Sequence, residues 1–323
     1  MPERFKNPWS ARVPGFRDVL RWKLGRGEKV VPEFPEARAA APVQPLTRDE
    51  LHFMPAHGWQ VTWLGHASFL LSGGGLHLLV DPMFAEYCGP SKLLGIRRKA
   101  PPPCGMDDLP PIAAVLLTHT HYDHCDLPTL RQLGQQVPLV VPEGHAAWFA
   151  KLGFHCVREL AWWQSADLAP GVSVTATPAQ HFTARSLWDR NRGHWCGWCV
   201  AAAGVKLWHS GDSGYCPAFR EIGARLGPLD FGMIAIGAYQ PRWFMQALHL
   251  HPAEAVRVFQ ETACRKATGM HWGTFQLSDE PLGEAPLLLA NSLLDNHLAP
   301  ARFEAGRIGQ QWSVPPGGAG GGC

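Results

Sequence analysis

The densest group of chemically reactive side chains in this sequence is Thr118-His119-Thr120-His121-Tyr122-Asp123-His124, which directly follows a continuous apolar run. Imidazole and carboxylate groups of this kind are good ligands for zinc. A single ion cannot take all four ligand-type side chains from so short a loop, because the directions of tetrahedral coordination diverge. The spacing therefore predicts two adjacent metals, one bound by His119 and His121 and the other by Asp123 and His124.

Three isolated residues of the same types follow later apolar runs. They are His181, Asp212 (within Ser210-Gly-Asp-Ser-Gly214) and His271. Each comes just after an expected strand, where loops gather over the edge of a sheet. Together with the cluster at 119–124 they complete a predicted set of seven ligands for two metals.

Short apolar segments separated by turn residues predict the strands that must position these side chains. The expected strands are 59–64, 68–71, 76–80, 112–118, 137–141, 172–176, 196–203, 205–208, 231–236 and 267–270. Helices are expected at 143–152, 217–226, 252–262 and 284–297, and Asp126 is expected to cap a helix after the metal loop. Two batches of strands with helices between and after them predict an α/β fold with two sheets packed face to face and the helices outside.

The first 57 residues, rich in Pro and charge, are expected to form a basic leader before a hydrolase domain at 58–314 and a flexible Gly-rich tail at 315–323. Residues 1–30 contain eight Lys/Arg and three Asp/Glu, although the whole chain has a net charge of only +2. Phe16, Val19, Leu20 and Trp22 recur at helical spacing among basic residues. Such a helix can lie on an anionic membrane or pack its apolar stripe on the protein body, and the spacing alone favours the body.

Composition excludes several classes of protein. Pro and Gly together are 63 of 323 residues, which is below the ~25–30% of low-complexity chains. No apolar run approaches the ~20 residues that span a bilayer, and the start lacks a secretory signal, so we expect a cytoplasmic protein with at most peripheral membrane contact through the leader. The small net charge argues against a nucleic-acid partner. The nine Cys lack a disulfide spacing, and Cys196 and Cys199 are expected to be buried thiols on a strand.

The ligand pattern resembles the metallo-β-lactamase superfamily, and longer motifs resemble its N-acyl-phosphatidylethanolamine-hydrolysing phospholipases D. These motifs are Val61-Thr-Trp-Leu-Gly-His-Ala67, Gly211-Asp-Ser-Gly-Tyr-Cys-Pro-Ala-Phe219, Gly237-Ala-Tyr-Gln-Pro-Arg-Trp-Phe-Met245 and Met270-His-Trp-Gly-Thr-Phe275, with Asn7-Pro-Trp9 and Val19-Leu-Arg-Trp22 in the leader. The resemblance covers roughly residues 4–312. It implies an αββα sandwich of two mixed sheets with outer helices.

The resemblance also implies roles for individual residues. His119, His121 and His181 would hold one zinc, Asp123, His124 and His271 a second, and Asp212 would bridge the two Zn²⁺ ions. His249 matches a His near the active site of those phospholipases, although Leu248 and His251 depart from the family's usual Gln and Asp. Apart from the resemblance, Asp81 is expected either to orient a ligand from outside the ligand set or to be a buried turn residue, and His66 either to approach the metals or to be structural. Tyr122 and Arg242 are candidates for contact with phosphate, and Arg242 could equally be packing.

These residues predict a dinuclear zinc phosphodiesterase of phospholipase D type. It would hydrolyse N-acyl-phosphatidylethanolamine or a similar phospholipid to phosphatidic acid and an N-acylethanolamine, with Asp123, Asp212 and His249 as the catalytic residues. One alternative is a metal-dependent hydrolase of a soluble lactone or phosphoester, and another is a non-catalytic scaffold at a membrane surface. The resembled phospholipases form dimers, which makes a homodimer an expectation by analogy.

Overall fold

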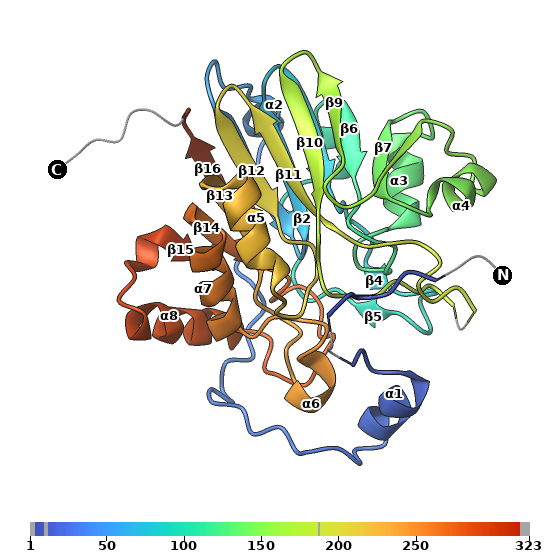
Figure 1. The fold of residues 1–323 in the computed structure, drawn as a ribbon, viewed down its shortest axis with the longest axis vertical. Helices are drawn as coiled ribbons and strands as arrows, with labels where there is room; N and C mark the ends of the chain where they lie inside the picture. Colours follow the sequence, from blue (N-terminus) through green and yellow to red (C-terminus); the bar gives the residue numbers. More distant parts are fainter. Residues whose placement is uncertain (1–3, 10–11, 187, 317–323) are drawn as a thin grey trace.

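Two seven-stranded sheets pack face to face and carry helices on their outer faces (Figure 1). The structure is a computed structural model, and it describes residues 4–9, 12–186 and 188–316. In spatial order the first sheet contains β16 (Gln311–Val314), β1 (Trp59–Gly65), β2 (Ser68–Gly73), β3 (Leu76–Val80), β6 (Ala114–Leu116), β7 (Leu139–Pro142) and β8 (Val157–Leu160). The second contains β15 (Phe303–Glu304), β14 (Cys264–Met270), β13 (Leu229–Ala235), β12 (Val205–His209), β11 (Gly197–Ala202), β10 (Val172–Thr177) and β9 (Ser165–Ala169).

Both sheets are mixed, and α-helices join all of their parallel neighbours except β3 and β6. In the first sheet the pairs from β16 to β3 are antiparallel and those from β3 to β8 are parallel. In the second, β9 to β12 are antiparallel and β12 to β15 are parallel. Parallel neighbours need a crossover connection. The crossover helices are α3 (Leu127–Leu133), α4 (Ala146–Lys151), α5 (Ala218–Leu226), α7 (Pro252–Glu261) and α8 (Ala285–Asp295).

Buried side chains at alternate positions of a strand belong to two different apolar layers, one between the sheets and one beneath the outer helices. On β2, Phe69 and Leu71 belong to the core between the sheets, whereas Leu70 packs with Leu130 of α3 and Phe149 of α4. Successive side chains of a strand point to opposite faces, so each buried strand serves both layers. The αββα sandwich predicted above is therefore confirmed.

The predicted strands are all present, with ends displaced by up to a few residues. Several short elements were not predicted, because each is only two to five residues long and shows no clear period. They are the strands at the edges of the sheets (β8, β9, β15 and β16), the hairpin β4 (Tyr87–Cys88) and β5 (Ile96–Arg97), and the helices α2 (Arg48–His52) and α6 (Arg242–Met245). Asp126 does precede α3, and its carboxylate accepts hydrogen bonds from the Thr129 hydroxyl and the Ala85 amide.

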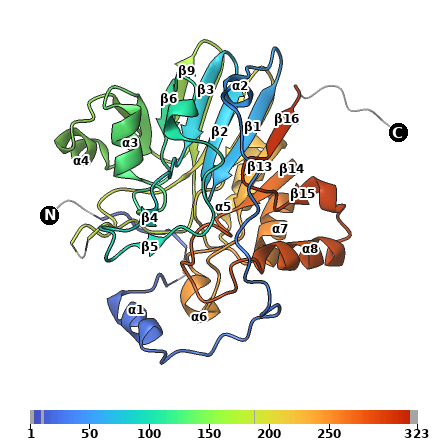
Figure 2. The ribbon, with the colours of Figure 1, turned by 180° about the vertical axis from the view of Figure 1, so that it is seen from behind.

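The leader runs along the body of the protein (Figure 2). The Asn7 side-chain amide donates to the carbonyl of His181 at 2.8 Å, and the Ala41 amide donates to the carbonyl of Gly273 at 3.0 Å. The separate domain from residue 58 stays a prediction. Of the predicted flexible tail, residues 317–323 lie outside the described part.

The leader contains the predicted helix, α1 (Phe16–Lys23), but the favoured placement of its apolar stripe on the body is wrong for three of its four residues. Phe16 is 66%, Val19 36% and Leu20 49% exposed. Trp22 holds the helix in place instead: its ring lies 4.9 Å from that of Phe244, and its Nε1 donates to Asp279 at 2.7 Å. Within the described residues, no helix is both long and apolar enough to span a bilayer.

Candidate metal centre

The predicted ligands converge at one edge of the sandwich, on loops that follow its strands. The loop at 119–124 lies between β6 and α3, and His181, Asp212 and His271 follow β10, β12 and β14. His66 lies in the turn between β1 and β2, and Asp81 follows β3. His66, Asp81 and His271 have positive φ angles of 53°, 42° and 66°, a conformation that is uncommon for residues other than Gly and that turns the chain sharply.

One group of donors consists only of imidazole nitrogens. His119 Nε2 lies 2.9 Å from His121 Nδ1, which in turn lies 3.2 Å from His181 Nε2. His119 and His181 are buried, and His121 is partly exposed. Three nitrogens at these separations surround a common point, as the ligands of one metal ion do.

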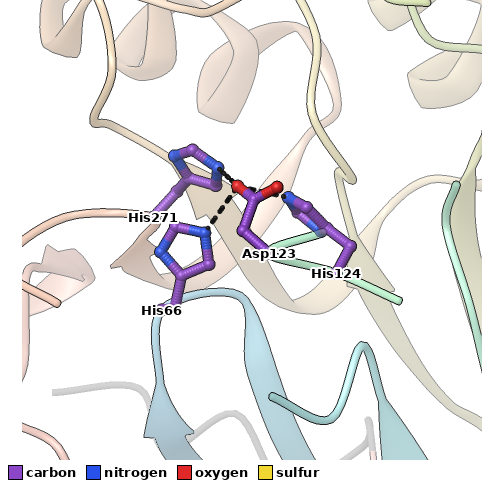
Figure 3. A group of neighbouring side chains, drawn as sticks. All are labelled: His66, Asp123, His124 and His271. Atoms are coloured by element: carbon purple, nitrogen blue, oxygen red, sulfur yellow. Dashed lines mark hydrogen bonds and ion pairs between the residues drawn. The ribbon is translucent and has the colours of Figure 1, made fainter. Parts of the chain in front are cut away.

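A second group surrounds the carboxylate of Asp123 (Figure 3). Asp123 Oδ2 lies 3.0 Å from His66 Nε2, 3.3 Å from His271 Nε2 and 3.5 Å from His124 Nε2. All four residues are buried, and their donor atoms lie within 4.8 Å of one another. His66, which the sequence left between two roles, therefore joins this group.

Asp212 lies between the two groups. Its Oδ2 is 3.1 Å from His124 Nε2 and 3.2 Å from His271 Nε2 on one side. On the other side it is 3.8 Å from His181 Nε2 and 4.0 Å from His119 Nε2. Its other oxygen is buried without a hydrogen-bond partner among the described residues. The structure thus brings Asp212 between the two groups, and its role as a bridge stays a prediction.

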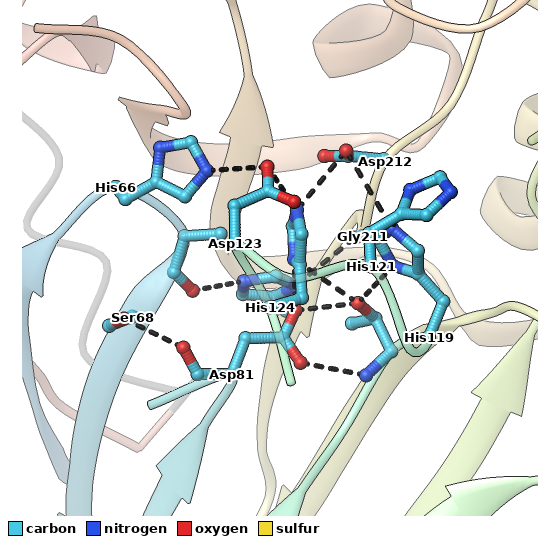
Figure 4. A network of polar contacts seen from close by, with 12 residues as sticks. His66, Ser68, Asp81, His119, His121, Asp123, His124, Gly211 and Asp212 are labelled. Atoms are coloured by element: carbon cyan, nitrogen blue, oxygen red, sulfur yellow. Dashed lines mark hydrogen bonds and ion pairs between the residues drawn. The ribbon is translucent and has the colours of Figure 1, made fainter. Parts of the chain in front are cut away.

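A network beneath the cluster fixes which nitrogen of each ring faces the centre (Figure 4). Asp81 accepts hydrogen bonds from the Thr118 amide at 2.7 Å, the Thr118 hydroxyl at 2.5 Å and His124 Nδ1 at 2.7 Å. Since the hydroxyl proton of Thr118 is used on Asp81, His119 Nδ1 donates its proton to Thr118 Oγ1 at 3.0 Å. His181 Nδ1 donates to the carbonyl of Leu248 at 3.0 Å.

These outward bonds turn Nε2 of His119, His124 and His181 toward the centre, where each offers a lone pair when its ring is neutral. A metal-binding His has this arrangement, with its second nitrogen held by a carboxylate, hydroxyl or carbonyl. His119 and His181 both direct such lone pairs toward His121 Nδ1, which has at most one proton to share between them. The donor set therefore fits a metal ion in each group.

The imidazoles of the site differ in pKa according to the carboxylates beside them. Burial lowers the pKa of His181 to about 3, so its imidazole is neutral at pH 7. Burial also lowers the pKa of His271, but the carboxylates of Asp212 and Asp123 outweigh it and raise that pKa to about 9. Burial would raise the pKa of both carboxyls, but the neighbouring His124 holds each well below its usual range. A bound cation would take the place of protons here, because metal ligands must be deprotonated.

Arg185 holds the loop at 119–124 in place from outside, a role that its position in the sequence does not indicate. Its Nη1 donates to the carbonyls of Thr120 at 2.9 Å and Cys125 at 2.8 Å, and its guanidinium lies 3.9 Å from the ring centroid of Tyr122. Tyr122 in turn donates its hydroxyl to the carbonyl of Arg185 at 3.0 Å. Both side chains therefore brace the loop that carries four ligands, and the Tyr122 hydroxyl is engaged with protein rather than directed at the cluster.

We expect Arg185→Met to weaken metal binding, because two loop carbonyls lose their charged donor. Loss of a partner that orients metal ligands typically lowers affinity ~10–100-fold. Arg185→Lys should recover only part of this loss, since an ammonium cannot reproduce the planar fork of the guanidinium. Titration with a competing chelator measures the effect, and Arg192→Met, at an exposed arginine nearby, is the matched control. Unchanged metal affinity in Arg185→Met would refute the role.

Two other predicted residues, Arg242 and His249, lie beside the cluster. The Arg242 Nη2 donates to both carboxylate oxygens of Glu254 at 2.9–3.0 Å, and its Nη1 donates to the carbonyl of His249 at 3.2 Å. His249 Nδ1 lies 3.8 Å from Asp212 Oδ2 and is buried without a hydrogen-bond partner among the described residues. The structure thus brings His249 to the centre and engages Arg242 with Glu254.

Comparisons with known proteins identify the family of this chain. The model of the beta-lactamase superfamily domain matches residues 77–272. N-acyl-phosphatidylethanolamine-hydrolyzing phospholipase D 1 of Caenorhabditis elegans is 32% identical, over 97% of this chain and 91% of its own length. The mitochondrial enzyme of the same name from Saccharomyces cerevisiae is also 32% identical, over 79% of this chain and 58% of its own. A metal-dependent hydrolase of Pyrobaculum islandicum is 27% identical, over 68% of this chain and 86% of its own.

Solved structures agree on the fold. Isothiocyanate hydrolase from Delia radicum gut bacteria has a TM-score of 0.65 at 19% identity, covering 80% of this chain and 99% of that one. A metallo-β-lactamase fold protein of Bacillus subtilis has a TM-score of 0.55 at 17% identity, covering 79% and 99%. The chain therefore belongs to the metallo-β-lactamase superfamily, as a metal-dependent hydrolase similar to the N-acyl-phosphatidylethanolamine-hydrolysing phospholipases D.

Proposed function

We propose that this protein is a dinuclear zinc phosphodiesterase of phospholipase D type, acting on N-acyl-phosphatidylethanolamine or a similar phospholipid. Water would add to phosphorus, and the bond from phosphorus to the ethanolamine oxygen would break. The products would be phosphatidic acid and an N-acylethanolamine, with the proton of water ending on the leaving oxygen. The observation that carries the proposal is the placing of Asp212 between two donor groups, in a chain whose similarity to such phospholipases extends over nearly its whole length.

Each group of side chains has a place in this proposal. His119, His121 and His181 would hold one zinc, and Asp123, His124 and His271 the other. His66 donates from Nε2 to Asp123, because its Nδ1 has no partner in the described part of the chain, and so would position that carboxylate. When bound, the ions would supply Lewis-acid stabilisation of phosphoryl oxygens and lower the pKa of water toward ~7. Asp81 would hold His124, and Asp212 would keep the two groups at a fixed separation.

His249 is the proposed substrate-contacting residue. Its Nδ1 faces Asp212 Oδ2 at 3.8 Å, too far for a hydrogen bond, and has no other partner among the described residues, so this nitrogen is the group that would bond a substrate oxygen. The bond from Arg242 to the His249 carbonyl, braced by Glu254, fixes the backbone from which this ring extends. In this reading Arg242 acts on the site through His249. Tyr122 acts through the metal loop, and a direct contact of either residue with phosphate is no longer part of the proposal.

We expect His249→Ala to lower kcat while the metal content stays unchanged. Loss of a group that transfers or shares a proton in the transition state typically costs ~10²–10⁴-fold in rate. Steady-state kinetics together with metal analysis measures both quantities. His145→Ala, at a buried His that bonds the carbonyl of His194 away from the cluster, is the control for effects on packing. If His249→Ala instead loses metal, the side chain is a ligand and its proposed role is wrong.

The substrate is tested with purified protein and dispersed N-acyl-phosphatidylethanolamine, using phosphorus NMR to identify the product. Appearance of phosphatidic acid, and its loss in Asp123→Asn and His271→Ala, would support the proposal. Intact lipid beside turnover of a soluble lactone or phosphoester would reject the phospholipase and favour the alternative hydrolase. The alternative also predicts full activity after deletion of residues 1–40 and no benefit from micelles. Homodimer formation and the membrane contact of the leader remain predictions beside this one.

A further inference from the structure

The first described residues of the leader, 4–9, turn every second side chain toward the body. Exposed and partly buried side chains alternate along this stretch, and the partly buried ones are Phe5, Asn7 and Trp9. Side chains two residues apart in an extended chain point to the same side. Pro8 favours such a conformation, because it restricts the residue before it to extended backbone angles.

Of these three side chains, Asn7 contacts a predicted metal ligand. Its Nδ2 donates to the carbonyl of His181 at 2.8 Å, and its Oδ1 is buried without a hydrogen-bond partner among the described residues. His181 is itself buried, and its Nδ1 donates to the carbonyl of Leu248. The backbone and the ring of this ligand are thus held by two different segments, both distant from it in the sequence.

Phe5 holds the segment that follows His181. The Phe5 amide donates to the carbonyl of Asn191 at 3.0 Å, and the side-chain amide of Asn191 donates back to the carbonyl of Phe5 at 3.1 Å. The backbone amide of Asn191 donates to the carbonyl of Thr183 at 2.8 Å. The leader therefore also fastens the segment from which Arg185 reaches the metal loop.

We propose that Asn7 is a positioning residue for the first donor group, which consists of His119, His121 and His181. Its hydrogen bond fixes the backbone from which the His181 ring reaches the centre, and so raises the affinity of this group for its metal ion. Asn7 acts through His181 and supplies no ligand itself. The role rests on the proposed function, since it presumes a metal ion in the first donor group.

The effect should be confined to one of the two donor groups. Near the second group the Ala41 amide bonds the carbonyl of Gly273, which is not a predicted ligand. Within the described part of the chain, no hydrogen bond joins the leader to Asp123, His124 or His271. A leader that merely stabilised the fold would affect both groups alike.

The test is a competition between the protein and a chelator for zinc, with and without Asn7→Ala, in two variant chains. In His271→Ala, which should keep the ion of the first group, we expect Asn7→Ala to lower zinc affinity about tenfold. This is the lower end of the usual range, because Asn7 holds the backbone of the ligand and not its ring. In His181→Ala, which should keep the ion of the second group, Asn7→Ala should change nothing, because its bond no longer acts on a ligand.

Hydrogen exchange of the metal-free chain measures the same restraint without any ion. We expect Asn7→Ala to speed exchange of the Thr183 and Asn191 backbone amides severalfold, because the segment that contains them loses an attachment to the leader. The amides of β14 should exchange as they do in the natural chain.

The matched control is Gln44→Ala, which removes another amide side chain of the leader. Gln44 Oε1 accepts from Arg307 Nε at 2.9 Å, and neither residue is a predicted ligand, so zinc affinity should stay unchanged. Deletion of residues 1–9 is a second variant and should weaken the first group at least as much as Asn7→Ala. Because leader deletions are expected to lose metal, their activity is interpreted together with their metal content. Thermal unfolding shows whether each variant folds.

Equal affinity of Asn7→Ala and Gln44→Ala for the ion of the first group would overturn the role of Asn7 and leave the dinuclear centre in place. An equal fall in affinity for both ions would also overturn it, because Asn7 would then support the whole chain. Absence of bound zinc in the natural chain would reject the proposed function itself, and the role of Asn7 with it.

Discussion

Asp212→Asn is expected to abolish hydrolysis and to reduce the number of metal ions that the chain holds. The carboxylate oxygen that lies 3.1–3.2 Å from His124 and His271, and within 4.0 Å of His119, would be replaced by a group with half its acceptors and no charge. If an amide nitrogen faced the cluster, its protons would meet the cations directly. We expect kcat/KM to fall on the order of 10³-fold or more, as measured by steady-state kinetics.

Two measurements keep the Asp212 result interpretable. Asp107→Asn removes the same charge at an exposed position and should leave both activity and metal content unchanged. Metal analysis of Asp212→Asn should show loss of at least one ion, because both donor groups share this residue. Full activity with an unchanged metal content would mean that Asp212 is not a ligand.

Asp81→Asn should have the second largest effect, although Asp81 lies behind the ligands. Its two oxygens accept three hydrogen bonds, from the Thr118 amide and hydroxyl and from His124 Nδ1, in a site with no exposure. An asparagine cannot accept all three, so a buried donor is left without a partner at a cost of ~1–3 kcal/mol. His124 also loses the bond that fixes its tautomer, and metal affinity should fall ~10–100-fold.

The Asp81 prediction is measured by thermal unfolding and by chelator competition. Asp126→Asn is the control, because Asp126 is also buried and accepts bonds from Thr129 and Ala85 without touching a predicted ligand. Both variants should be destabilised, but only Asp81→Asn should lose metal affinity. Equal metal affinity in the two variants would show that Asp81 supports the fold alone.

The sequence predicts which side chains the fold brings together because these residues are tied to strand ends. His119, His121, Asp123 and His124 share one loop, and their spacing is the basis for predicting two metals. His181, Asp212 and His271 are found because each follows an apolar run, and the carboxyl ends of such strands meet at one edge of the sandwich. At these positions the apolar runs in the sequence and the fold that brings their carboxyl ends together point to the same residues.

Contacts between loops could not be predicted in this way. Arg185 reaches Thr120 and Cys125 only because the segment after His181 folds over the metal loop, and no spacing in the sequence records that conformation. The same limit applies to α1. Helical spacing groups Trp22 with Phe16, Val19 and Leu20, but of these four only Trp22 packs on the body, and periodicity does not show which part of a stripe a neighbour covers.

The two departures from the family pattern have structural explanations. Leu248 positions His181 through its carbonyl, so this bond does not depend on which side chain is present. His251 caps α7 by accepting from the Ala253 amide at Nδ1, a role that an Asp at the same position could also perform. Neither change alters the donor atoms of the metal centre.

The most direct test of this account is the ratio of metal to protein, determined by mass spectrometry on the chain loaded with zinc and then desalted at neutral pH. The account predicts about two ions per chain, and loss of one in His271→Ala while the group of His119, His121 and His181 keeps the other. A ratio well under one ion per chain would contradict the dinuclear centre and favour the non-catalytic scaffold.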